Sequence, residues 1–329
     1  MFNRKALIVG INNYPHSKLN CCVNDANAVS ELLEYNHDGS KNFEIIKLLD
    51  EEATESNIKE RLRQVFDDDT DTGVFFFAGH GGPYGAKSAQ LITSDYYDKN
   101  DGLSFTELND VLANSKCKNK VVILDCCFSG MAGNDSLVEG ISRLSKGTTI
   151  LAACRENESA NEAGEHGVFT NLLVYALGGG SSDIFGRVTP ASIYAYIDSC
   201  LGGFEQRPLF KSYVASFVTL RQCEPKMTQT EIRTLAKLFE NHNSKLQLDP
   251  SYEPTNYEGS TEIAPGDLQQ PYCTKEHTKV FALLQKANRN GLIVPTSEKH
   301  MYYAAVHSDT CQLTDLGVQY WLLAAKKII

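Results

Sequence analysis

Two short segments of the sequence carry side chains that could perform nucleophilic chemistry. Residues 78–82 read AGHGG and residues 125–130 read DCCFSG, which places His80 and Cys127 47 residues apart. A cysteine thiolate is a strong nucleophile near neutral pH, and a nearby imidazole raises the fraction of thiol that is ionised. The glycines beside the histidine let the backbone turn sharply. The two segments therefore indicate covalent catalysis by cysteine, if the fold brings them together.

The elements around these segments alternate between strand-like and helix-like patterns. Continuous apolar runs, typical of buried parallel strands, occupy 5–11, 43–49, 73–78, 120–125 and 148–153, with a sixth candidate strand at 213–220. Because amphipathic helices are predicted between them, residues 1–222 should form an α/β domain with a mostly parallel sheet. His80 and Cys127 would then follow neighbouring strands at the carboxyl edge, where catalytic groups of such sheets gather.

The remainder of the chain reads differently. Residues 223–270 are polar and rich in turn-forming residues, which predicts a linker or connecting segment. Residues 271–329 predict a small α+β domain with helices at 276–288 and 314–326 and a strand at 301–306. This last region carries seven Lys and Arg against four Asp and Glu.

Overall composition narrows the function classes. The chain has 31 basic and 41 acidic residues, a net charge of −10, which argues against a protein that coats nucleic acid. Its apolar runs are too short to span a bilayer, and no signal-peptide pattern follows the N-terminus, so we expect a cytoplasmic location without membrane association. Ten cysteines are present, but no CxxC spacing, so common zinc sites are not predicted and the thiols should be reduced.

Seven motifs occur in an order that resembles a known family. They are LIVGINNY (7–14), NCCVNDA (20–26), AGHG (78–81), DCCFSG (125–130), AACR (152–155), GVFT (167–170) and QRP (206–208). Together they resemble caspase-fold cysteine peptidases of peptidase family C14, and metacaspases and bacterial caspase-like proteins more than animal caspases. The resemblance covers about two thirds of the chain and implies a six-stranded, mostly parallel sheet flanked by helices.

The resemblance also implies roles for the reactive residues. Cys127 would be the nucleophile, His80 its acid/base partner, and the backbone N–H groups of Gly81 and Cys127 the oxyanion hole. The neighbouring thiol of Cys126 should point to the opposite face of the strand and pack in the core. An intact Cys127–His80 pair counts against the alternative of a catalytically silent adaptor.

Substrate preference follows from the same resemblance. Metacaspases cleave after Arg or Lys with an acidic S1 pocket, and their two pocket acids match Asp25 and Asp125, with Cys22 at a further lining position. A carboxylate pair suits the planar donors of a guanidinium. The alternatives are that Asp25 is only a favourable charge at a helix N-terminus and that Asp125 only orients its loop. In the family, a serine often precedes the Gly-His-Gly segment that contains the histidine. This sequence has Ala78 at that position, and the difference should alter the shape of the pocket.

Two further properties of the family concern a requirement for calcium and cleavage of the chain by itself. No cofactor is needed for the chemistry and no metal site is assigned, but some metacaspases require calcium, and Asp95, Asp98 and Asp101 form a short acidic loop. Residues 131–147 occupy the interdomain-loop position of the family and contain Arg143 and Lys146, where an enzyme with basic preference could cut itself.

The last 59 residues resemble, loosely, winged-helix-like domains that follow bacterial caspase-like domains. A nucleotide or phosphate could bind the residues His300, Tyr302, Tyr303 and His307, whereas the simpler interpretation is a packing domain whose aromatic residues form its core. The resemblance implies a latent endopeptidase that acts in a bacterial stress or anti-phage response. A ligand or a partner would switch it on, and a nucleotide second messenger is one candidate ligand. The alternatives are a catalytically silent adaptor and a nucleic-acid-binding regulator, each acting through this domain. The net negative charge of the chain argues against nucleic-acid binding.

Overall fold

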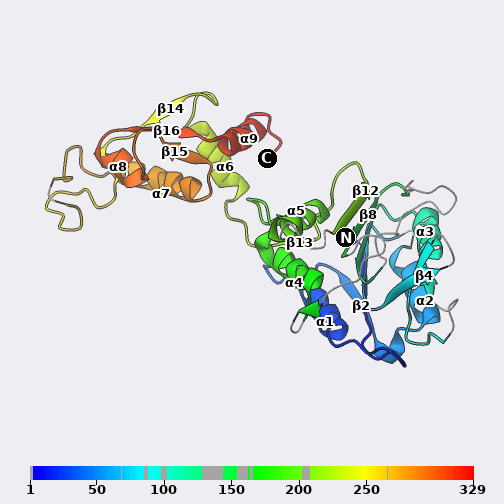
Figure 1. Cartoon of the computed structure of the whole chain (residues 1–329). Helices are drawn as coiled ribbons and strands as arrows, with labels where there is room; N and C mark the ends of the chain where they lie inside the picture. Colours follow the sequence, from blue (N-terminus) through cyan, green and yellow to red (C-terminus); the bar gives the residue numbers. More distant parts are fainter. Residues whose placement is uncertain are drawn as a thin grey trace. The chain divides into compact units, whose positions relative to one another are not determined.

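The chain folds into two compact units, Met1–Glu224 and Pro225–Ile329, each described here by itself (Figure 1). The computed structural model describes residues 3–67, 69–84, 88–97, 102–127, 144–153, 162–163, 166–201, 208–264 and 266–329. Within these ranges, none of the helices combines the length and apolar character needed to cross a membrane.

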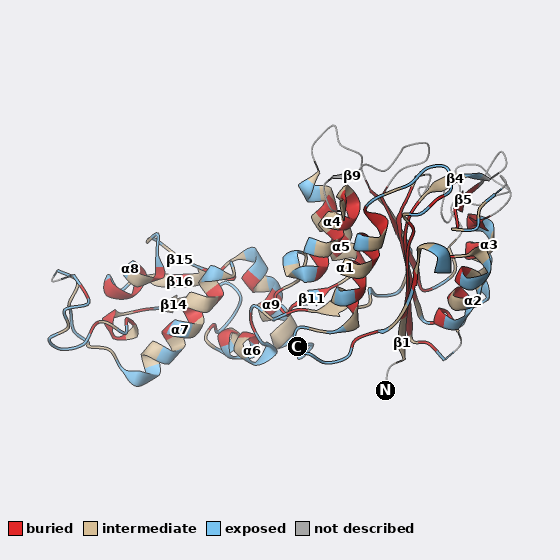
Figure 2. Ribbon diagram, turned by 90° about the horizontal axis from the view of Figure 1, so that it is seen from below, coloured by how far each residue is buried: buried red, intermediate tan, exposed pale blue. Residues whose placement is uncertain are grey.

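A six-stranded sheet lies at the centre of the described part of the first unit (Figure 2). Its spatial order is β12 (Leu209–Tyr213), β8 (Thr148–Ala152), β7 (Asn119–Asp125), β3 (Thr72–Ala78), β1 (Arg4–Gly10) and β2 (Glu44–Leu49). All neighbouring pairs are parallel except β12, which runs antiparallel to β8. The predicted α/β class with a mostly parallel sheet is therefore confirmed.

The sixth strand occupies a different segment from the predicted 213–220. Strand β12 ends at Tyr213, and its Phe210 ring stacks on Tyr194 of helix α5 (Pro190–Cys200), with ring centroids 5.2 Å apart. The apolar residues after Tyr213 instead lead to Leu220, which is fully buried and donates its N–H to the carbonyl of Val188. The predicted strand at 213–220 is therefore wrong: Tyr213 and Phe217 are exposed, Leu220 is the buried residue of the run, and the segment that pairs with the sheet is Leu209–Tyr213.

Helices cover both faces of the sheet (Figure 2). One face carries α1 (Cys22–Glu34), α4 (Val168–Tyr175) and α5, and the other carries α2 (Glu55–Val65) and α3 (Phe105–Asn114). Successive side chains of a strand point to opposite faces. Accordingly, Phe75 and Phe77 of β3 enter the core on the α2/α3 side, whereas Val74 and Phe76 enter the core on the α1/α4 side. All four are fully buried, as expected for a central strand covered on both faces.

Short elements surround the carboxyl edge of the sheet. They are β4 (Gly81–Tyr84), β5 (Ser88–Leu91) and β6 (Leu103–Ser104), which form a small antiparallel sheet, and the pair β9 (Glu162–Ala163) and β10 (His166–Gly167). Figure 2 shows β4, β5 and β9 at the same end of the central sheet. Elsewhere lie η1 (Asp50–Glu52), η3 (Ala176–Gly180), β11 (Arg187–Val188) and β13 (Arg221–Gln222).

The second unit is a small α+β structure. Its elements are α6 (Gln229–Lys237), β14 (Lys245–Gln247), η4 (Pro250–Tyr252), α7 (Lys275–Arg289), β15 (Ile293–Pro295), α8 (Met301–Val306), β16 (Thr310–Leu313) and α9 (Asp315–Ala325). The three strands form an antiparallel sheet in the order β14-β16-β15.

The segment 223–270 differs from the predicted connecting segment. A capping box between Thr228 and Glu231 starts α6, whose Ile232 and Leu235 are buried, and β14 adds an edge strand to the sheet. Farther along, the fully buried Asn256 bonds to three backbone carbonyls and so orders the turn-rich stretch. The polar, turn-rich composition was therefore no sign of a linker, because side-chain hydrogen bonds satisfy this backbone.

Within the second unit, the predicted helices at 276–288 and 314–326 correspond to α7 and α9. The predicted strand at 301–306 is wrong, because these residues form helix α8. Met301, Ala304 and Ala305 are buried at helical spacing, so one helical face, rather than one strand face, meets the core. The winged-helix-like character of the unit stays a prediction.

Candidate active site

The sheet brings the two reactive segments together at its carboxyl edge. Strands β3 and β7 are parallel neighbours, and their last residues, Ala78 and Asp125, are paired in register. The N–H of Gly79 donates to the carbonyl of Asp125 over 3.3 Å, which extends the pairing beyond the strands. His80 and Cys127 each follow two residues after that register pair. The structure thus places both residues where the sequence predicted, on adjacent strand ends.

Gly81 lies directly against the backbone of Cys127. A Cβ built on Gly81 would be 2.0 Å from the carbonyl oxygen of Cys127 and 3.3 Å from the Sγ of Cys126. Only glycine permits this approach, because any side chain would push the two backbones apart. The contact fixes the spacing between the histidine segment and the cysteine segment, including the N–H groups predicted to form an oxyanion hole.

A backbone carbonyl orients the imidazole of His80. Its Nε2 lies 2.7 Å from the carbonyl oxygen of Ser17, and since a carbonyl can only accept, Nε2 carries the hydrogen. The other ring nitrogen, Nδ1, is then the basic one in the neutral ring. This hydrogen bond fixes the tautomer of the imidazole.

Tyr14 holds the backbone and the ring of the same histidine. Its hydroxyl accepts the N–H of His80 and donates to the carbonyl of Ile92, both over 3.0 Å, while the two rings lie 4.6 Å apart. Tyr14 is 4% exposed, and burial raises the pKa of its hydroxyl well above the usual 10, so the group stays protonated. Sequence reasoning missed Tyr14 and Ser17 as partners of His80, although Tyr14 belongs to the motif at 7–14.

The two adjacent thiols have different surroundings. Cys126 is 1% exposed and packs in the α2/α3-side core with Val122 and Leu124, as predicted. Cys127 is partly exposed and forms no disulfide. Of this vicinal pair, Cys127 is therefore the thiol that a substrate can reach.

Two buried carboxylates converge beside the same strand end. Asp25 lies in the first turn of α1 and is 2% exposed; Asp125 ends β7 and is 8% exposed. A Cβ built on Gly167 would be 2.8 Å from Oδ2 of Asp125 and 3.5 Å from Oδ2 of Asp25, so both carboxylates face this glycine. The structure thus brings together the two acids that the family resemblance assigned to one pocket.

Hydrogen-bond donors from β10 and α4 surround these acids. His166 lies with Nδ1 2.7 Å from Oδ1 of Asp25, and the Gly167 N–H donates to its Oδ2 over 3.3 Å. The hydroxyl of Thr170 donates to Oδ2 of Asp125 over 2.6 Å. The N-termini of α1 and α4 add a favourable field for negative charge. Sequence reasoning missed His166 and Thr170 as partners, although the motif at 167–170 marks the segment.

Cys22, the third residue predicted for this pocket, opens helix α1. It is 7% exposed, packs in the α1/α4-side core, and donates its N–H to Oδ1 of Asn12 over 2.9 Å. Because residues three apart on a helix share a face, Cys22 and Asp25 lie on the same side of α1.

Comparison with known proteins identifies the family. The family profile of the peptidase C14 caspase domain matches residues 3–277. This chain belongs to the caspase-domain family. It is therefore a member of a family of cysteine peptidases that act on protein substrates, as its motif order indicated.

One solved structure shares this fold, and a second has a lower similarity score. A crystal structure of a protein from Geobacter sulfurreducens has 17% sequence identity and a TM-score of 0.51, covering 68% of this chain and 98% of that chain. A caspase-1 from Spodoptera frugiperda has 12% identity and a TM-score of 0.49, covering 67% and 92%. A search of curated proteins found no match. At 17% identity the similarity to the Geobacter sulfurreducens protein concerns the fold alone.

Of the three aspartates considered as calcium ligands in the acidic loop after His80, Asp95 is the one that the structure describes. Oδ1 of Asp95 accepts the N–H of Glu55 over 3.0 Å and the hydroxyl of Thr93 over 2.7 Å, so this carboxylate closes the start of α2. Asp98 and Asp101 lie outside the described residues. Among the residues that the structure describes, no group of three or more potential ligands is arranged to hold a metal ion.

The predicted self-processing positions fall at the edge of the described chain. Arg143 lies outside it, as do residues 128–142 between Cys127 and that arginine. Lys146 is described and exposed, in the turn that leads into β8. An exposed turn of this kind is a typical site of proteolytic cleavage.

The four residues predicted to bind a nucleotide gather on or next to α8. The rings of His300, Tyr303 and His307 follow one another along the helix, with centroids 6.2 and 5.6 Å apart. However, His307 Nδ1 lies 2.9 Å from a carboxylate oxygen of Glu298. Tyr302 donates its hydroxyl to the carboxylate of Asp267 over 3.1 Å, and burial together with that carboxylate raises the pKa of Tyr302 to about 12. The structure thus collects these residues but pairs two of them with acids.

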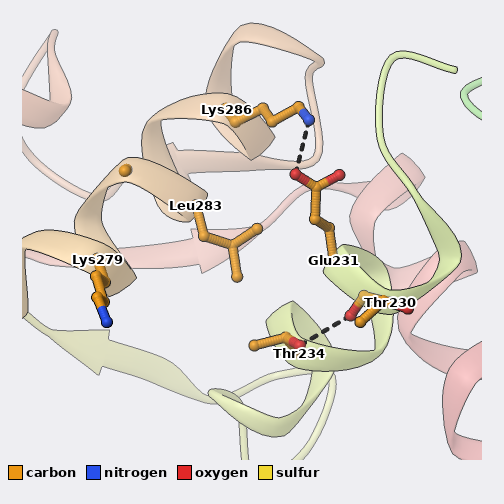
Figure 3. Close-up of a pocket in the computed structure, with 7 residues that line it drawn as sticks. Thr230, Glu231, Thr234, Lys279, Leu283 and Lys286 are labelled. Carbon is orange, nitrogen blue, oxygen red and sulfur yellow. Dashed lines mark hydrogen bonds and ion pairs between the residues drawn. The ribbon is translucent and has the colours of Figure 1, made fainter. Parts of the chain in front are cut away.

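A separate groove lies between α6 and α7 of the second unit (Figure 3). Its volume is about 350 Å³, and it is lined by Thr230, Glu231, Thr234, Lys279, Ala282, Leu283 and Lys286. Lys286 donates to Oε1 of Glu231 over 2.7 Å, so one of the two lysines is already paired with a carboxylate.

Proposed function

We propose that this caspase-domain chain is a cysteine endopeptidase that hydrolyses peptide bonds after arginine and, less well, after lysine. The observation that carries the proposal is the convergence of two buried carboxylates, Asp25 and Asp125, at Gly167. One of them precedes Cys127 by only two residues. The planar donors of a guanidinium match a carboxylate pair, which supports a basic side chain as the occupant of the pocket.

The chemistry assigned to the strand ends is nucleophilic catalysis. The thiolate of Cys127 attacks the scissile carbonyl carbon and forms a C–S bond, while the carbonyl oxygen becomes an oxyanion held by the N–H groups of Gly81 and Cys127. Collapse breaks the C–N bond, and protonated His80 gives its proton to the leaving amine. His80 then takes a proton from water, whose oxygen attacks the thioester and releases the acid and the Cys127 thiolate.

Tautomer control supports this role of His80. Because Nε2–H is committed to the carbonyl of Ser17, Nδ1 is the nitrogen that would exchange the proton with Cys127 and the leaving group. Loss of that orientation would cost activity without removing any reacting atom.

We further propose that the endopeptidase is latent, that the second unit controls it through a partner or a ligand such as a nucleotide, and that it serves a bacterial stress or anti-phage response. Support comes from the motif order and from a second compact unit that carries no part of the proposed active site. A separate proposal is that calcium activates it at the acidic loop after His80. Self-cleavage near Arg143 or Lys146 would suit a basic preference and an exposed turn.

Hydrolysis of fluorogenic peptides ending in Arg, Lys or Asp tests the proposal. Wild type is compared with Cys127→Ala and, as a matched control, Cys126→Ala, each with and without calcium and a mixture of cyclic nucleotides. Arg cleavage that is lost in Cys127→Ala and kept in Cys126→Ala is expected. Cleavage after Asp would refute the acidic pocket. Silence under all conditions would leave a missing activator and a catalytically silent adaptor, which identification of the ligand of residues 271–329 would distinguish.

A further inference from the structure

We propose that Asp50 is a positioning residue of the peptidase, because its carboxylate holds the loop that orients both His80 and the helix of the acidic pocket. The inference rests on the proposed function, since it concerns the same catalytic edge. The loop comprises residues 11–21 and joins β1 to α1. Asp50 itself belongs to none of the motifs that indicated the family.

Asp50 lies at the carboxyl edge of the central sheet. It directly follows β2, whose last residue, Leu49, is in register with Gly10 at the end of β1. Its Oδ1 accepts the backbone N–H groups of Asn12 over 2.7 Å and Asn13 over 2.9 Å. Hydrogen bonds to a carboxylate are stronger than those between neutral groups. One oxygen atom therefore holds two successive peptide groups at the start of the loop.

The backbone of Asp50 has an uncommon conformation. Its φ is 43°, in the left-handed region that residues other than glycine rarely adopt, although Asp and Asn adopt it more readily than most. Conformations of this kind persist where the surroundings hold them, and they cluster at active sites. The conformation is independent of the two hydrogen bonds and points to the same conclusion.

Asn12 passes the constraint on to the rest of the loop. Its carbonyl oxygen accepts the N–H groups of Tyr14 over 3.1 Å and Leu19 over 3.0 Å, so the loop closes on itself. Its side-chain Oδ1 accepts the N–H groups of Cys22 over 2.9 Å and Val23 over 3.4 Å. The same residue therefore orders the loop and caps the first turn of α1.

The loop reaches both parts of the proposed machinery. The Tyr14 hydroxyl accepts the N–H of His80 over 3.0 Å, and the carbonyl oxygen of Ser17 lies 2.7 Å from Nε2 of the same histidine. The first turn of α1, which follows the loop, carries Asp25 of the acidic pocket. A displacement of the loop would therefore move the base and the pocket together. The carboxylate that prevents this displacement acts through the loop and not on the substrate.

Two substitutions at position 50 separate the carboxylate from the backbone conformation. Asp50→Gly removes the acceptor but adopts a φ of 43° without strain. Asp50→Asn keeps Oδ1 as an acceptor and also tolerates this conformation. Asp183→Gly is the matched control, because Oδ1 of Asp183 likewise accepts two backbone N–H groups, those of Phe185 and Arg187, both over 2.9 Å. Asp183 follows η3, beyond the end of α4 that lies away from the acid pair.

The orientation of His80 is measured without turnover. The full chain is labelled with ¹⁵N-histidine, and the resonances of His80 are assigned by their absence in His80→Gln. At pH 8.5, where histidine is ordinarily neutral, the nitrogen shifts distinguish the Nε2–H tautomer from the Nδ1–H tautomer. We expect the Nε2–H tautomer in wild type, Asp50→Asn and Asp183→Gly. A mixture of the two tautomers is expected in Asp50→Gly, because the carbonyl of Ser17 no longer selects one.

Kinetics on an arginine peptide provide the second readout. In Asp50→Gly, kcat should fall at least about tenfold and KM should rise about threefold or more, because a misplacement of about 1 Å can cost about 100-fold in rate. In Asp50→Asn both constants should stay within about threefold of wild type. Urea unfolding controls for stability. Asp183→Gly should lower the free energy of unfolding as Asp50→Gly does, yet leave kcat, KM and the tautomer of His80 unchanged.

The outcomes separate this inference from the proposed function. The Nδ1–H tautomer in wild type overturns the positioning role, and that measurement needs no variant at position 50. Asp50→Gly with the tautomer and the kcat of wild type overturns it as well. Mixed tautomers in Asp50→Gly, in a chain that cleaves only after Asp, support the positioning role and refute the acidic pocket.

Discussion

Replacing Gly81 with alanine should push the segment that carries His80 away from the segment that carries Cys127. The added Cβ would lie 2.0 Å from the carbonyl oxygen of Cys127, whereas ordinary contacts begin at 3.4 Å. The neighbouring backbones must therefore move apart by about 1.4 Å. Both atoms that collide belong to short segments anchored in the sheet, so neither a rotamer change nor a flexible side chain can absorb the shift.

The size of the effect follows from that displacement. A misplacement of about 1 Å between reacting groups can cost about 100-fold in rate, so kcat should fall at least that much, or about 2.7 kcal/mol of barrier. Because the added methyl overpacks a filled site, the free energy of unfolding should fall by about 1–3 kcal/mol. The protein should still fold, since the rest of the sheet is unchanged.

Gly82→Ala provides the matched control. Its Cβ would lie 3.4 Å from the Cδ1 of Ile92, an ordinary contact, so kcat should stay within about threefold of wild type. The assay measures kcat and KM on an arginine peptide, with urea unfolding of each variant. A second readout, independent of turnover, is the rate at which iodoacetamide modifies Cys127. If Gly81→Ala matched Gly82→Ala in all three measurements, the close approach of the two segments would be refuted.

Three further predictions follow from the same contacts. Cys127→Ala should abolish hydrolysis, whereas Cys126→Ala should keep it and lower the free energy of unfolding by on the order of 1 kcal/mol, as urea denaturation would show, because it removes a packed sulfur. Tyr14→Phe leaves the N–H of His80 without its acceptor and should lower kcat with little change in KM, at a stability cost of about 1–3 kcal/mol; an unchanged kcat would exclude a positioning role. Burial raises the pKa of the Cys311 thiol to about 12, so its thiolate is scarce at pH 8, and mass spectrometry should find it alkylated only after unfolding.

The sequence was sufficient to predict the sheet and the edge that carries Cys127 and His80. Long apolar runs identify central strands, and each reactive segment directly follows one of them. Parallel strands end on the same edge, so adjacency of β3 and β7 completes the placement. The sequence could not predict the partners of His80, because a backbone carbonyl such as that of Ser17 has no residue-type signature.

Long-range side-chain pairs escaped prediction for a related reason. His166 and Asp25 are 141 residues apart and meet only because α1 and β10 lie side by side in the fold. The wrong strand at 301–306 has a local cause. Six residues with two tyrosines and a valine fit either period, and only burial of Met301, Ala304 and Ala305 selects the helix.

The donors around the acid pair explain why two buried carboxylates can lie so close before any substrate binds. Asp25 receives hydrogen bonds from His166 and from the Gly167 N–H, and Asp125 receives one from Thr170. These donors and the helix N-termini reduce the repulsion between the carboxylates. In the proposed pocket a guanidinium would add a positive charge and several donors, whereas a neutral side chain would desolvate the acids without replacing the water they lose. Discrimination against neutral residues would therefore come mainly from the cost of leaving buried acceptors unpaired, which is how binding sites achieve their largest selectivities.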